Sequence, residues 1–240
     1  MLESLRAGRD IERLVMIDDI ELGAQLREII ILAEAAGIPV DAVSRRELEG
    51  QSQTKRSQGV LAVVPDPRYH SPEAFVTAAN RKGESALIVM LDGVQDPHNL
   101  GAIARTADAA GAHGLIIPER RAVGITPGAV SASAGALEHV RVARVVNLNR
   151  AIEGLKEAGV LVVGLDADGE IGYTKADFTG PVVIVVGSEG KGLSRLVREN
   201  CDQIVSIPMA GKLSSLNVSV SAGIVLYEVL RQRNAKRSAG

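Results

Sequence analysis

Apolar positions near the start of the chain recur three or four residues apart, the spacing of one face of an α-helix. They predict an amphipathic helix over Glu21 to Ala36, ended by Gly37 and built on Leu22, Leu26, Ile29, Ile30 and Ala33. Two short apolar runs, Val40 to Val43 and Gly59 to Val64, predict strands after that helix. The chain therefore opens with a small α/β unit that ends near Val64.

A proline-rich segment follows this unit and indicates a domain boundary. Prolines at 65, 67 and 72 interrupt the apolar pattern, and Ser71-Pro72 places proline at the favoured first position of a short helix that extends to about Asn80. We therefore expect two domains, one over residues 1–68 and one over residues 72–240.

From Ala86 onward, short apolar runs rich in Val and Ile alternate with helical segments. The runs lack polar alternation, as is typical of strands buried on both faces of a parallel sheet: Leu87–Leu91, Gly114–Ile117, Arg144–Leu148, Val160–Leu165, Val182–Val186 and Ile204–Ile207. The helical segments are Asn99–Ala110, Gly128–Glu138, Asn149–Ala158, Leu193–Asn200 and Leu216–Arg233. Six strands with intervening helices predict a doubly wound α/β fold.

Three strand ends carry polar or glycine-rich segments, and parallel sheets bind ligands at such carboxyl ends. The segments span residues 91–107, 186–193 and 207–221. Each also has a plain structural explanation. The glycines of the second segment suit a tight turn, and Ser215 and Asn217 suit helix caps. Arg105 and Glu189 suit a simple ion pair, so spacing alone leaves a shared active site as one alternative among these.

Several common catalytic motifs are absent. The first predicted strand of the large domain is not followed by Gly-x-Gly-x-x-Gly, the turn at Gly187 lacks a Gly-Lys-Ser/Thr ending, and no Gly-x-Ser-x-Gly occurs. The single cysteine, Cys201, is interpreted as a small buried residue and excludes a disulfide framework within the chain. The four histidines lie far apart without ligand spacing, so we expect no metal site.

The amino-acid composition argues against several further classes of protein. Hydrophobic residues make up 46% and charged residues 23% of the chain, which argues against a disordered protein. Aromatic residues make up only 2%, which argues against a binding face built on stacked rings. The segment Met1 to Asp10 lacks the apolar region of a signal peptide, and no apolar run approaches the length of a membrane span. We therefore expect a cytoplasmic protein that makes no contact with a membrane.

The net charge of −2 lacks the basic excess that many nucleic-acid-binding proteins show. Two local basic groups could still contact phosphates: Arg45, Arg46, Lys55 and Arg56 near the start, and Arg231, Arg233, Lys236 and Arg237 at the end. The alternative is that both are solvated surfaces. Ser44 and Glu47 beside the first group have the spacing of a capping box, which predicts a helix start there.

Taken together, the three strand-end segments resemble the SpoU/TrmH family of RNA ribose 2'-O-methyltransferases, part of the SPOUT class. Residues 99–105 match its Asn-x-Gly…Arg motif, 187–190 its Gly-x-Glu-Gly motif, and 207–219 its Ile-Pro-Met…Ser-Leu-Asn-Val-Ser motif, in the family's order. The resemblance implies S-adenosylmethionine (SAM) as cofactor and a homodimer whose active site is completed across the interface. It also implies a C-terminal trefoil knot, although chains almost never thread through a loop.

The resemblance also implies roles for individual residues. Arg105 would lie near the ribose 2'-hydroxyl and a substrate phosphate, oriented by Asn99 and Glu189. Ser215 and Asn217 would complete the catalytic pocket, and SAM would contact the backbone of Gly187, Ile207 and Leu216. The pKa of an arginine exceeds about 12, so a guanidinium that removes a proton is demanding, and a simple phosphate clamp is the alternative.

The N-terminal segment carries a Gly-Arg…Ile-Pro-Val…Gln-Gly-Val pattern at residues 8–9, 38–40 and 58–60. In this pattern it resembles the small L30e-like domain of enzymes that methylate a guanosine of 23S rRNA. This similarity implies an RNA-substrate-binding domain over residues 1–68, with Arg45, Arg46, Lys55 and Arg56 as candidate contacts, acting on 23S rRNA or on an assembling large ribosomal subunit. The alternatives are a tRNA ribose methyltransferase, a resistance-type methyltransferase of an rRNA adenosine, and an inactive RNA-binding assembly factor. The presence of Asn99, Arg105, Glu189 and Asn217 argues against the last.

Overall fold

The computed structural model describes Leu2, Leu5 and residues 11–19, 23–51, 59–65 and 67–239. The chain divides into two compact units, Met1–Pro67 and Arg68–Gly240. Lys55 and Arg56, two of the candidate RNA contacts, lie outside the described residues.

Within residues 11–19, 23–51 and 59–65, the first unit is a three-stranded sheet with two helices. Its strands are β1 (Arg13–Ile17), β2 (Val40–Val43) and β3 (Val60–Val63), in the order β2-β1-β3, and its helices are α2 (Ala24–Ala35) and α3 (Arg45–Gln51). β1 pairs with β2 in parallel and with β3 in antiparallel orientation. The predicted helix and both predicted strands are present, whereas the central strand β1 was not predicted.

The packing of β1 explains why its sequence lacks polar alternation. Leu14 faces the cluster built on Ile29 and Ala33 of α2, whereas Val15 and Ile17 face Leu48 of α3. Because successive strand residues point to opposite faces, a helix on each face makes Leu14 to Ile17 of β1 all apolar. The predicted capping box is confirmed at the start of α3, where the Ser44 hydroxyl donates to Oε2 of Glu47 over 2.8 Å. The Glu47 backbone donates in return to the Ser44 hydroxyl over 3.4 Å.

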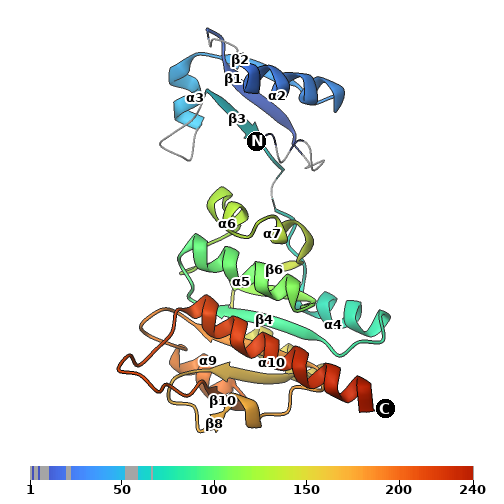
Figure 1. Ribbon diagram of the computed structural model, residues 1–240, viewed down its shortest axis with the longest axis vertical. Helices are drawn as coiled ribbons and strands as arrows, with labels where there is room; N and C mark the ends of the chain where they lie inside the picture. Colours follow the sequence, from blue (N-terminus) through green and yellow to red (C-terminus); the bar gives the residue numbers. More distant parts are fainter. Residues whose placement is uncertain are drawn as a thin grey trace. The chain divides into compact units, whose positions relative to one another are not determined.

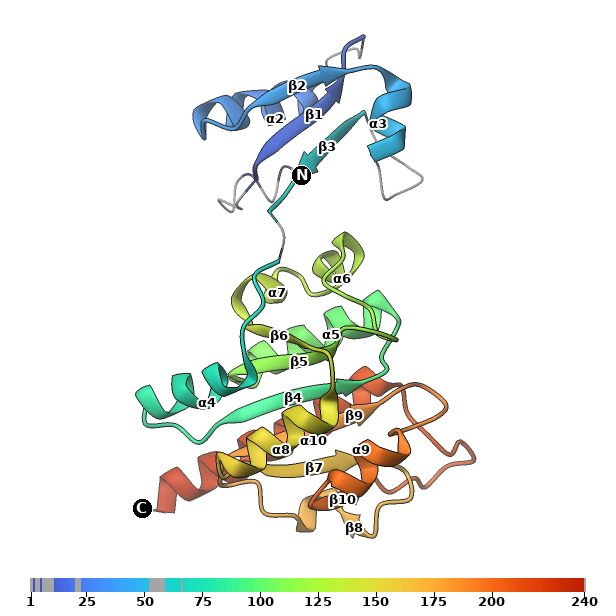
Figure 2. The same ribbon diagram turned by 180° about the vertical axis from the view of Figure 1, so that it is seen from behind.

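The second unit is built on a seven-stranded parallel sheet (Figures 1 and 2). The strand order is β6-β5-β4-β9-β7-β10-β8. The strands are β4 (Leu87–Asp92), β5 (Gly114–Pro118), β6 (Val142–Val145), β7 (Leu161–Leu165), β8 (Ile171–Gly172), β9 (Val182–Gly187) and β10 (Gln203–Ser206). This sheet confirms the predicted α/β class.

Two features of the sheet differ from prediction. The run predicted at 144–148 forms β6 two residues earlier, because the Asn147 side chain accepts the backbone N–H of Asn149 over 2.9 Å and starts a helix at Leu148. The two-residue strand β8 at the sheet edge was not predicted, because so short a run carries no pattern.

Helices cover both faces of this sheet. One face packs against α5 (Pro97–Ala109), α7 (Ala136–His139) and α10 (Val218–Ala239), the other against α4 (Pro72–Arg81), α8 (Leu148–Glu157) and α9 (Arg195–Asn200). The segment predicted as one helix over 128–138 is broken into α6 (Pro127–Ala132) and α7. The break lies at Ala134 and Gly135, whose φ angles of 49° and 90° are left-handed and incompatible with a continuous helix.

The sheet brings the three motif segments to one edge. β4 pairs with β9 so that Asp92 lies opposite Gly187, and both strands end there. β9 pairs next with β7, and β7 with β10, which leads into the third segment. The parallel order therefore gathers these carboxyl ends, as expected. The threading of the C-terminal chain into a knot stays a prediction.

Candidate active site

Three side chains from the three motif segments meet in one hydrogen-bonded cluster, called here the site cluster. Nδ2 of Asn99 donates to Oε1 of Glu189 over 2.9 Å. Nδ2 of Asn217 donates to the same carboxylate oxygen over 2.8 Å and to Oδ1 of Asn99 over 3.0 Å. These residues are 28 to 118 positions apart in sequence, so only the fold brings them together.

Helix starts hold two members of the site cluster. Asn99 is buried in the first turn of α5, which begins with Pro97 and is capped by Asp96, whose carboxylate accepts the backbone N–H of His98 over 2.9 Å. Asn217 precedes α10, and its Oδ1 accepts the backbone N–H of Ser219 over 2.8 Å. The helix-cap interpretation of Asn217 is thus correct, and its amide nitrogen remains available for the site cluster.

Glu189 lies on a tight turn after β9. The turn closes through two backbone hydrogen bonds of 3.0 Å between Ser188 and Gly192. A Cβ added to Gly187 would lie 2.1 Å from the carbonyl carbon of Gly192, so packing of the turn on itself requires this glycine. Gly190 has a φ of 77° and open space around it. Glycine at 187 is therefore needed to shape the turn, whereas a Cβ at Gly190 would meet no other atom.

A cavity of about 710 Å³ lies at the ends of β7, β9 and β10. Every residue proposed for the cofactor lines it, together with three of the proposed catalytic residues: Gly187, Ile207, Leu216, Glu189, Ser215 and Asn217. The volume is that of a typical small-molecule site. Six residues singled out from the sequence thus line one cavity, although Ser215 makes no hydrogen bond to a described residue.

The chemistry of this cavity fits SAM. Residues 208–216 are exposed and their backbone groups make no hydrogen bonds to other described residues, so these groups are available to an adenine ring. Asp168 and Glu189 supply negative charge that suits a sulfonium and an ammonium group, whereas Asp166 is already paired with Arg198 over 3.0 Å. Gly187, Ile207 and Leu216 could therefore hold the cofactor through their backbones.

Arg105 stands apart from the site cluster. It is exposed on α5, does not line the cavity at the ends of β7, β9 and β10, and has no hydrogen bond or ion pair with any described residue. Six residues along a helix amount to about 120° of rotation and about 9 Å of rise, so Arg105 and Asn99 point in different directions. The expected orientation of Arg105 by Asn99 and Glu189 is absent from the single chain, as is the alternative Arg105–Glu189 ion pair.

Cys201 and the histidines show no catalytic arrangement. The Cys201 thiol donates to the carbonyl of Val197 over 3.2 Å, and burial raises its pKa to about 11. The thiol therefore stays protonated at neutral pH, which confirms the structural interpretation of this residue. Among the described residues no group of His, Cys, Asp and Glu has the arrangement of a metal site, and no described helix is long and apolar enough to span a membrane.

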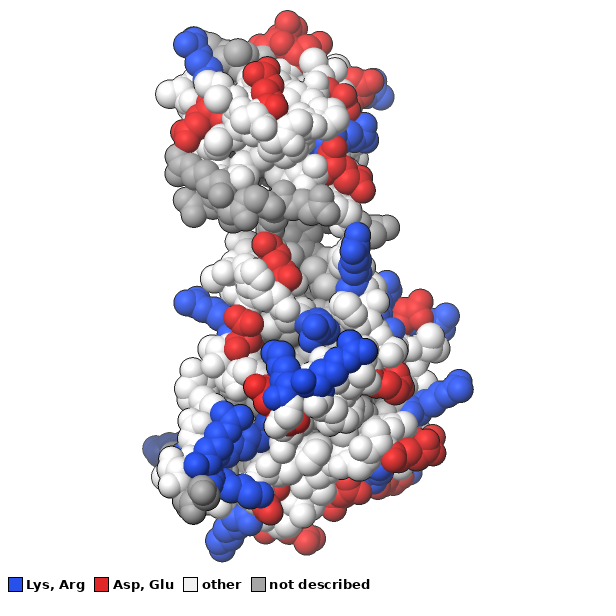
Figure 3. All heavy atoms as spheres, turned by 90° about the vertical axis from the view of Figure 1, so that its right-hand side faces the viewer, with Lys and Arg blue, Asp and Glu red and all other residues white. Residues whose placement is uncertain are grey.

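The two basic groups differ in their surroundings. Arg45 and Arg46 are exposed on α3. In the C-terminal group, Arg231 forms an ion pair of 2.7 Å with Glu228, and the Arg233 guanidinium donates to four backbone carbonyls. Figure 3 shows Lys and Arg gathered on the face of the second unit where α10 ends. Two arginines of this group thus have structural roles.

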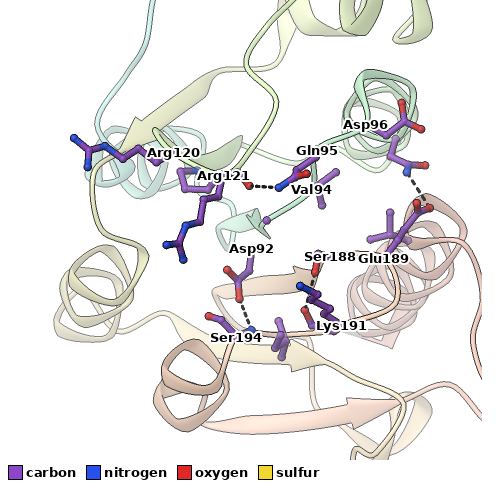
Figure 4. Close-up of a pocket in the computed structure, with 16 residues that line it drawn as sticks. Asp92, Val94, Gln95, Asp96, Arg120, Arg121, Ser188, Glu189, Lys191 and Ser194 are labelled. Atoms are coloured by element: carbon purple, nitrogen blue, oxygen red, sulfur yellow. Dashed lines mark hydrogen bonds between the residues drawn. The ribbon is translucent and has the colours of Figure 1, made fainter.

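A second cavity, of about 740 Å³, was not predicted (Figure 4). Asn99 and Glu189 line it together with Arg120, Arg121 and Lys191. The sequence signal that could have revealed it is the Arg120-Arg121 pair directly after β5, at the same sheet edge as the three motif segments.

Two family models match the chain. The SpoU rRNA methylase family model matches residues 86–227, and the model of the RNA 2'-O ribose methyltransferase substrate-binding domain matches residues 1–70. YacO of Bacillus subtilis, named for the TrmH family of tRNA/rRNA methyltransferases, is 46% identical over 98% of this chain and 93% of its own length. An uncharacterized tRNA/rRNA methyltransferase of Mycobacterium sp. strain KMS is 46% identical over 98% of this chain and 75% of its own.

Solved structures agree with these matches. The SpoU methyltransferase AviRb of Streptomyces viridochromogenes, crystallised with SAM, is 30% identical with a TM-score of 0.73, covering 98% of this chain and 88% of its own. A SAM-bound rRNA methyltransferase of Sinorhizobium meliloti is 29% identical with a TM-score of 0.72, covering 96% of this chain and 83% of its own. Both structures span the two units of this chain. The chain therefore belongs to the SpoU/TrmH family and is a SAM-dependent RNA methyltransferase.

Proposed function

We propose that this enzyme methylates a ribose 2'-hydroxyl of RNA, on a guanosine of 23S rRNA. The observation that carries the ribose assignment is the site cluster, which borders a cavity whose chemistry fits SAM. Support for the position of the methyl group comes from the substrate-binding model over residues 1–70, which belongs to RNA 2'-O ribose methyltransferases. The proposal places the reaction in the cytoplasm, the reducing setting that a lone cysteine favours.

The relative coverage of solved structures supports rRNA over tRNA. The rRNA methyltransferase of Sinorhizobium meliloti covers 96% of this chain, whereas the TrmH/SpoU tRNA-modifying enzyme of A. aeolicus covers 68%. A substrate-binding unit ahead of the methyltransferase unit is therefore shared with the former. We expect this additional unit to determine whether the enzyme methylates rRNA or tRNA.

Direct mapping of the modification tests this proposal. Unmodified 23S rRNA and a tRNA pool, both transcribed in vitro, are incubated with the protein and SAM, digested to nucleosides and analysed by mass spectrometry. The expected product is 2'-O-methylguanosine in 23S rRNA. Methylation of a base, of tRNA alone or of a different rRNA nucleoside would each refute the corresponding part of the proposal.

In the proposed mechanism, SAM supplies the methyl group that the ribose 2'-oxygen attacks. The residues of the chain hold that hydroxyl in line with the methyl group, and such positioning accounts for several kcal/mol of the barrier. The two amides of the site cluster fix the Glu189 carboxylate at the border of both cavities. Arg105 contacts a substrate phosphate, and its guanidine group, after losing a proton to solvent, accepts the hydroxyl proton as the oxygen attacks.

We propose that Arg105 reaches the reacting hydroxyl from a second copy of the chain. Within one copy Arg105 is exposed and has no partner among the described residues. Exposed apolar side chains on the third motif segment and α10 support a homodimer in this region: Leu213, Leu216, Val220 and Tyr227. The proposed trefoil knot would hold the same segment in place.

Mixing two inactive variants tests this dimeric site. Arg105→Ala and Asn217→Asp homodimers are each expected to be nearly inactive, but a mixed dimer contains one site in which both residues are intact. Co-expression from two tagged copies is expected to restore up to about half of the wild-type activity per mixed dimer. Absence of any recovery in purified mixed dimers would refute the exchange of Arg105 between copies.

A further inference from the structure

The second cavity adjoins the first through a shared wall. Ser188, Glu189, Lys191 and Gly192 line both cavities. Asn99 lines the second cavity, so two of the three members of the site cluster face it. A molecule in this cavity therefore contacts the site cluster, whereas the first cavity is suited to SAM.

The cations of this cavity have no partners among the described residues. Arg120, Arg121 and Lys191 are exposed, and none of their side chains forms a hydrogen bond or an ion pair with any described residue. Three unpaired positive side chains at one cavity favour an anionic ligand. Two arginines in sequence also offer the planar donor geometry that binds phosphate oxygens in pairs.

The carboxylates of the same cavity are already engaged. Asp92 accepts the backbone N–H of Ser194 over 2.6 Å, and Asp96 caps α5. Glu189 is held by the two amides of the site cluster. Since each carboxylate accepts hydrogen bonds from fixed donors, none is paired with the three cations, which remain available to a ligand.

The loop that carries the two arginines is held against the cavity. The backbone N–H of Val123 donates to the carbonyl of Val94 over 3.0 Å, and the side-chain nitrogen of Gln95 lies 3.5 Å from the carbonyl oxygen of Arg121. Arg121 has a φ of 60°, a left-handed conformation that is unfavourable for a non-glycine residue. Figure 4 shows Arg120 and Arg121 on one side of the cavity and Lys191 across from them.

We propose that this cavity binds the RNA phosphodiester groups that flank the methylated ribose, through Arg120, Arg121 and Lys191. The inference rests on the proposed function, since it takes RNA as the substrate that reaches the site cluster. The three residues act as positioning residues: they fix the backbone of the target strand so that its 2'-hydroxyl lies at Glu189 and Asn99. Lys191 also lines the SAM cavity, so the two arginines provide the cleaner test.

The test compares the Arg120→Gln/Arg121→Gln double variant with Arg150→Gln. Arg150 is a matched control, because it is exposed on α8 and its side chain bonds to no described residue. Binding of radiolabelled, unmodified 23S rRNA transcript is measured by filter retention over a series of KCl concentrations. The double variant is expected to bind at least about tenfold more weakly, with a salt slope shallower by about 0.7 to 1.8, the value for one or two lost phosphate contacts.

Three further measurements make the result decisive. Calorimetric SAM affinity is expected to be unchanged in the double variant, and Arg120→Lys/Arg121→Lys is expected to retain the wild-type salt slope. A double variant with wild-type RNA affinity and slope, or an equal loss in Arg150→Gln, overturns the inference. A tRNA transcript pool is tested in parallel, and failure of the wild-type protein to bind either RNA also overturns it.

The proposed function fails in a different way. A wild-type protein that binds the transcript but transfers no methyl group to its ribose refutes the proposed function, while the comparison of RNA binding between variants stays valid.

Discussion

The side-chain nitrogen of Asn217 lies 2.8 Å from Oε1 of Glu189, and the same Asn217 caps α10 through its other side-chain atom. One residue thus links the start of the last helix to the turn after β9. The two functions use different atoms, Oδ1 for the cap and Nδ2 for the carboxylate. A substitution can therefore remove one function and keep the other.

Replacing Asn217 by aspartate separates these functions. The variant would still have a capped α10, because aspartate caps a helix as well as asparagine does. The substitution would place a second carboxylate beside Glu189 where an amide donated before, and repulsion would displace both groups. We expect methyl transfer to fall by about 10²-fold or more, similar to the loss of one positioned donor in other enzymes.

Single-turnover methylation assays and thermal unfolding check this prediction. The thermal midpoint is expected to stay within a few degrees of the wild-type value. Asn217→Ser, which also caps but leaves no charge, is the matched control and is expected to lose less activity. Wild-type turnover in the aspartate variant would show that the contact with Glu189 has no catalytic importance.

Gly187→Ala is expected to weaken SAM binding more than tenfold without unfolding the sheet. The new methyl group would lie 2.1 Å from the carbonyl carbon of Gly192. The atoms nearest to it belong to the backbone, so no flexible side chain can move aside. The turn must then open, which displaces Ser188 and Glu189 from the cavity. Gly190→Ala is the control, because its surroundings are open and only its left-handed φ of 77° resists the substitution.

Isothermal titration with SAM measures both glycine variants. The expected order of affinity is wild type, then Gly190→Ala, then Gly187→Ala with more than tenfold weaker binding. Equal affinity of the two variants would contradict the assignment of Gly187 to turn closure.

Much of the second unit was predictable because its core strands are buried on both faces. Continuous runs such as Leu87–Leu91 and Val182–Val186 are rare outside parallel sheets, so they identified β4 and β9 directly. The strand β1 was not predicted, although its apolar run Leu14–Ile17 lies between Arg13 and Asp18 and resembles the runs of the second unit. Its place at the centre of a sheet depends on β2 and β3, which come later in sequence.

The sequence indicated which residues lie in the candidate site, but it did not indicate which hydrogen bonds they form. Motif matches brought Asn99, Glu189 and Asn217 together, and the structure adds that they bond to one another and, among the described residues, to no arginine. Helix periodicity already separates Asn99 from Arg105 by about a third of a turn. The second cavity escaped prediction because Arg120 and Arg121 follow a strand without any glycine-rich signature.

Arg233 is expected to contribute strongly to stability. Its guanidinium donates to the carbonyls of Ser85, Ala86, Phe178 and Gly180 over 2.8 to 3.2 Å, and so ties α10 to the segments before β4 and β9. Arg233→Met keeps the apolar stem and removes all four donors. We expect the free energy of unfolding to fall by roughly 2–4 kcal/mol, since buried carbonyls lose their partners.

Urea denaturation of the second-unit transition measures this loss. Arg231→Ala is the control: the Arg231 side chain is mostly exposed, and its buried partner Glu228 keeps the hydrogen bond from Gln232, so we expect a smaller loss. A loss in Arg233→Met no greater than that of Arg231→Ala would refute the structural role of Arg233.

The stability of the second unit is expected to decrease as the solution becomes mildly acidic. His113 is buried, its Nδ1 accepts the backbone N–H of Leu87 over 3.1 Å, and Nε2 lies 3.1 Å from a carboxylate oxygen of Glu84. Burial lowers the pKa of His113 because it disfavours the charged imidazolium. The unfolded chain therefore binds a proton near the ordinary pKa of about 6.5 while the folded chain does not, and stability falls as the pH drops below that value.

Urea denaturation at pH 7.5, 6.5 and 5.5 tests whether the free energy of unfolding falls as the pH is lowered. His113→Gln, which keeps an acceptor for Leu87 and does not titrate, is expected to have a lower free energy of unfolding at pH 7.5 but a flatter pH dependence. A wild-type protein that gains stability on acidification over this range would contradict the burial argument.

Removing the first unit is expected to separate cofactor binding from RNA methylation. The second unit carries both cavities and its own buried core, and its chain begins with a segment in which Tyr69 pairs with Val142 and the His70 backbone donates to the Val142 carbonyl over 2.8 Å. Deletion of residues 1–67 keeps that segment. SAM affinity by calorimetry is expected to stay within about twofold of the full-length value, whereas methyl transfer to 23S rRNA transcript should fall at least tenfold. A less disruptive variant is Arg45→Gln/Arg46→Gln in the full chain, because both arginines are exposed on α3. Its KM for RNA should rise with little change in kcat. Full activity of the deleted protein on rRNA would show that the first unit does not dock the substrate.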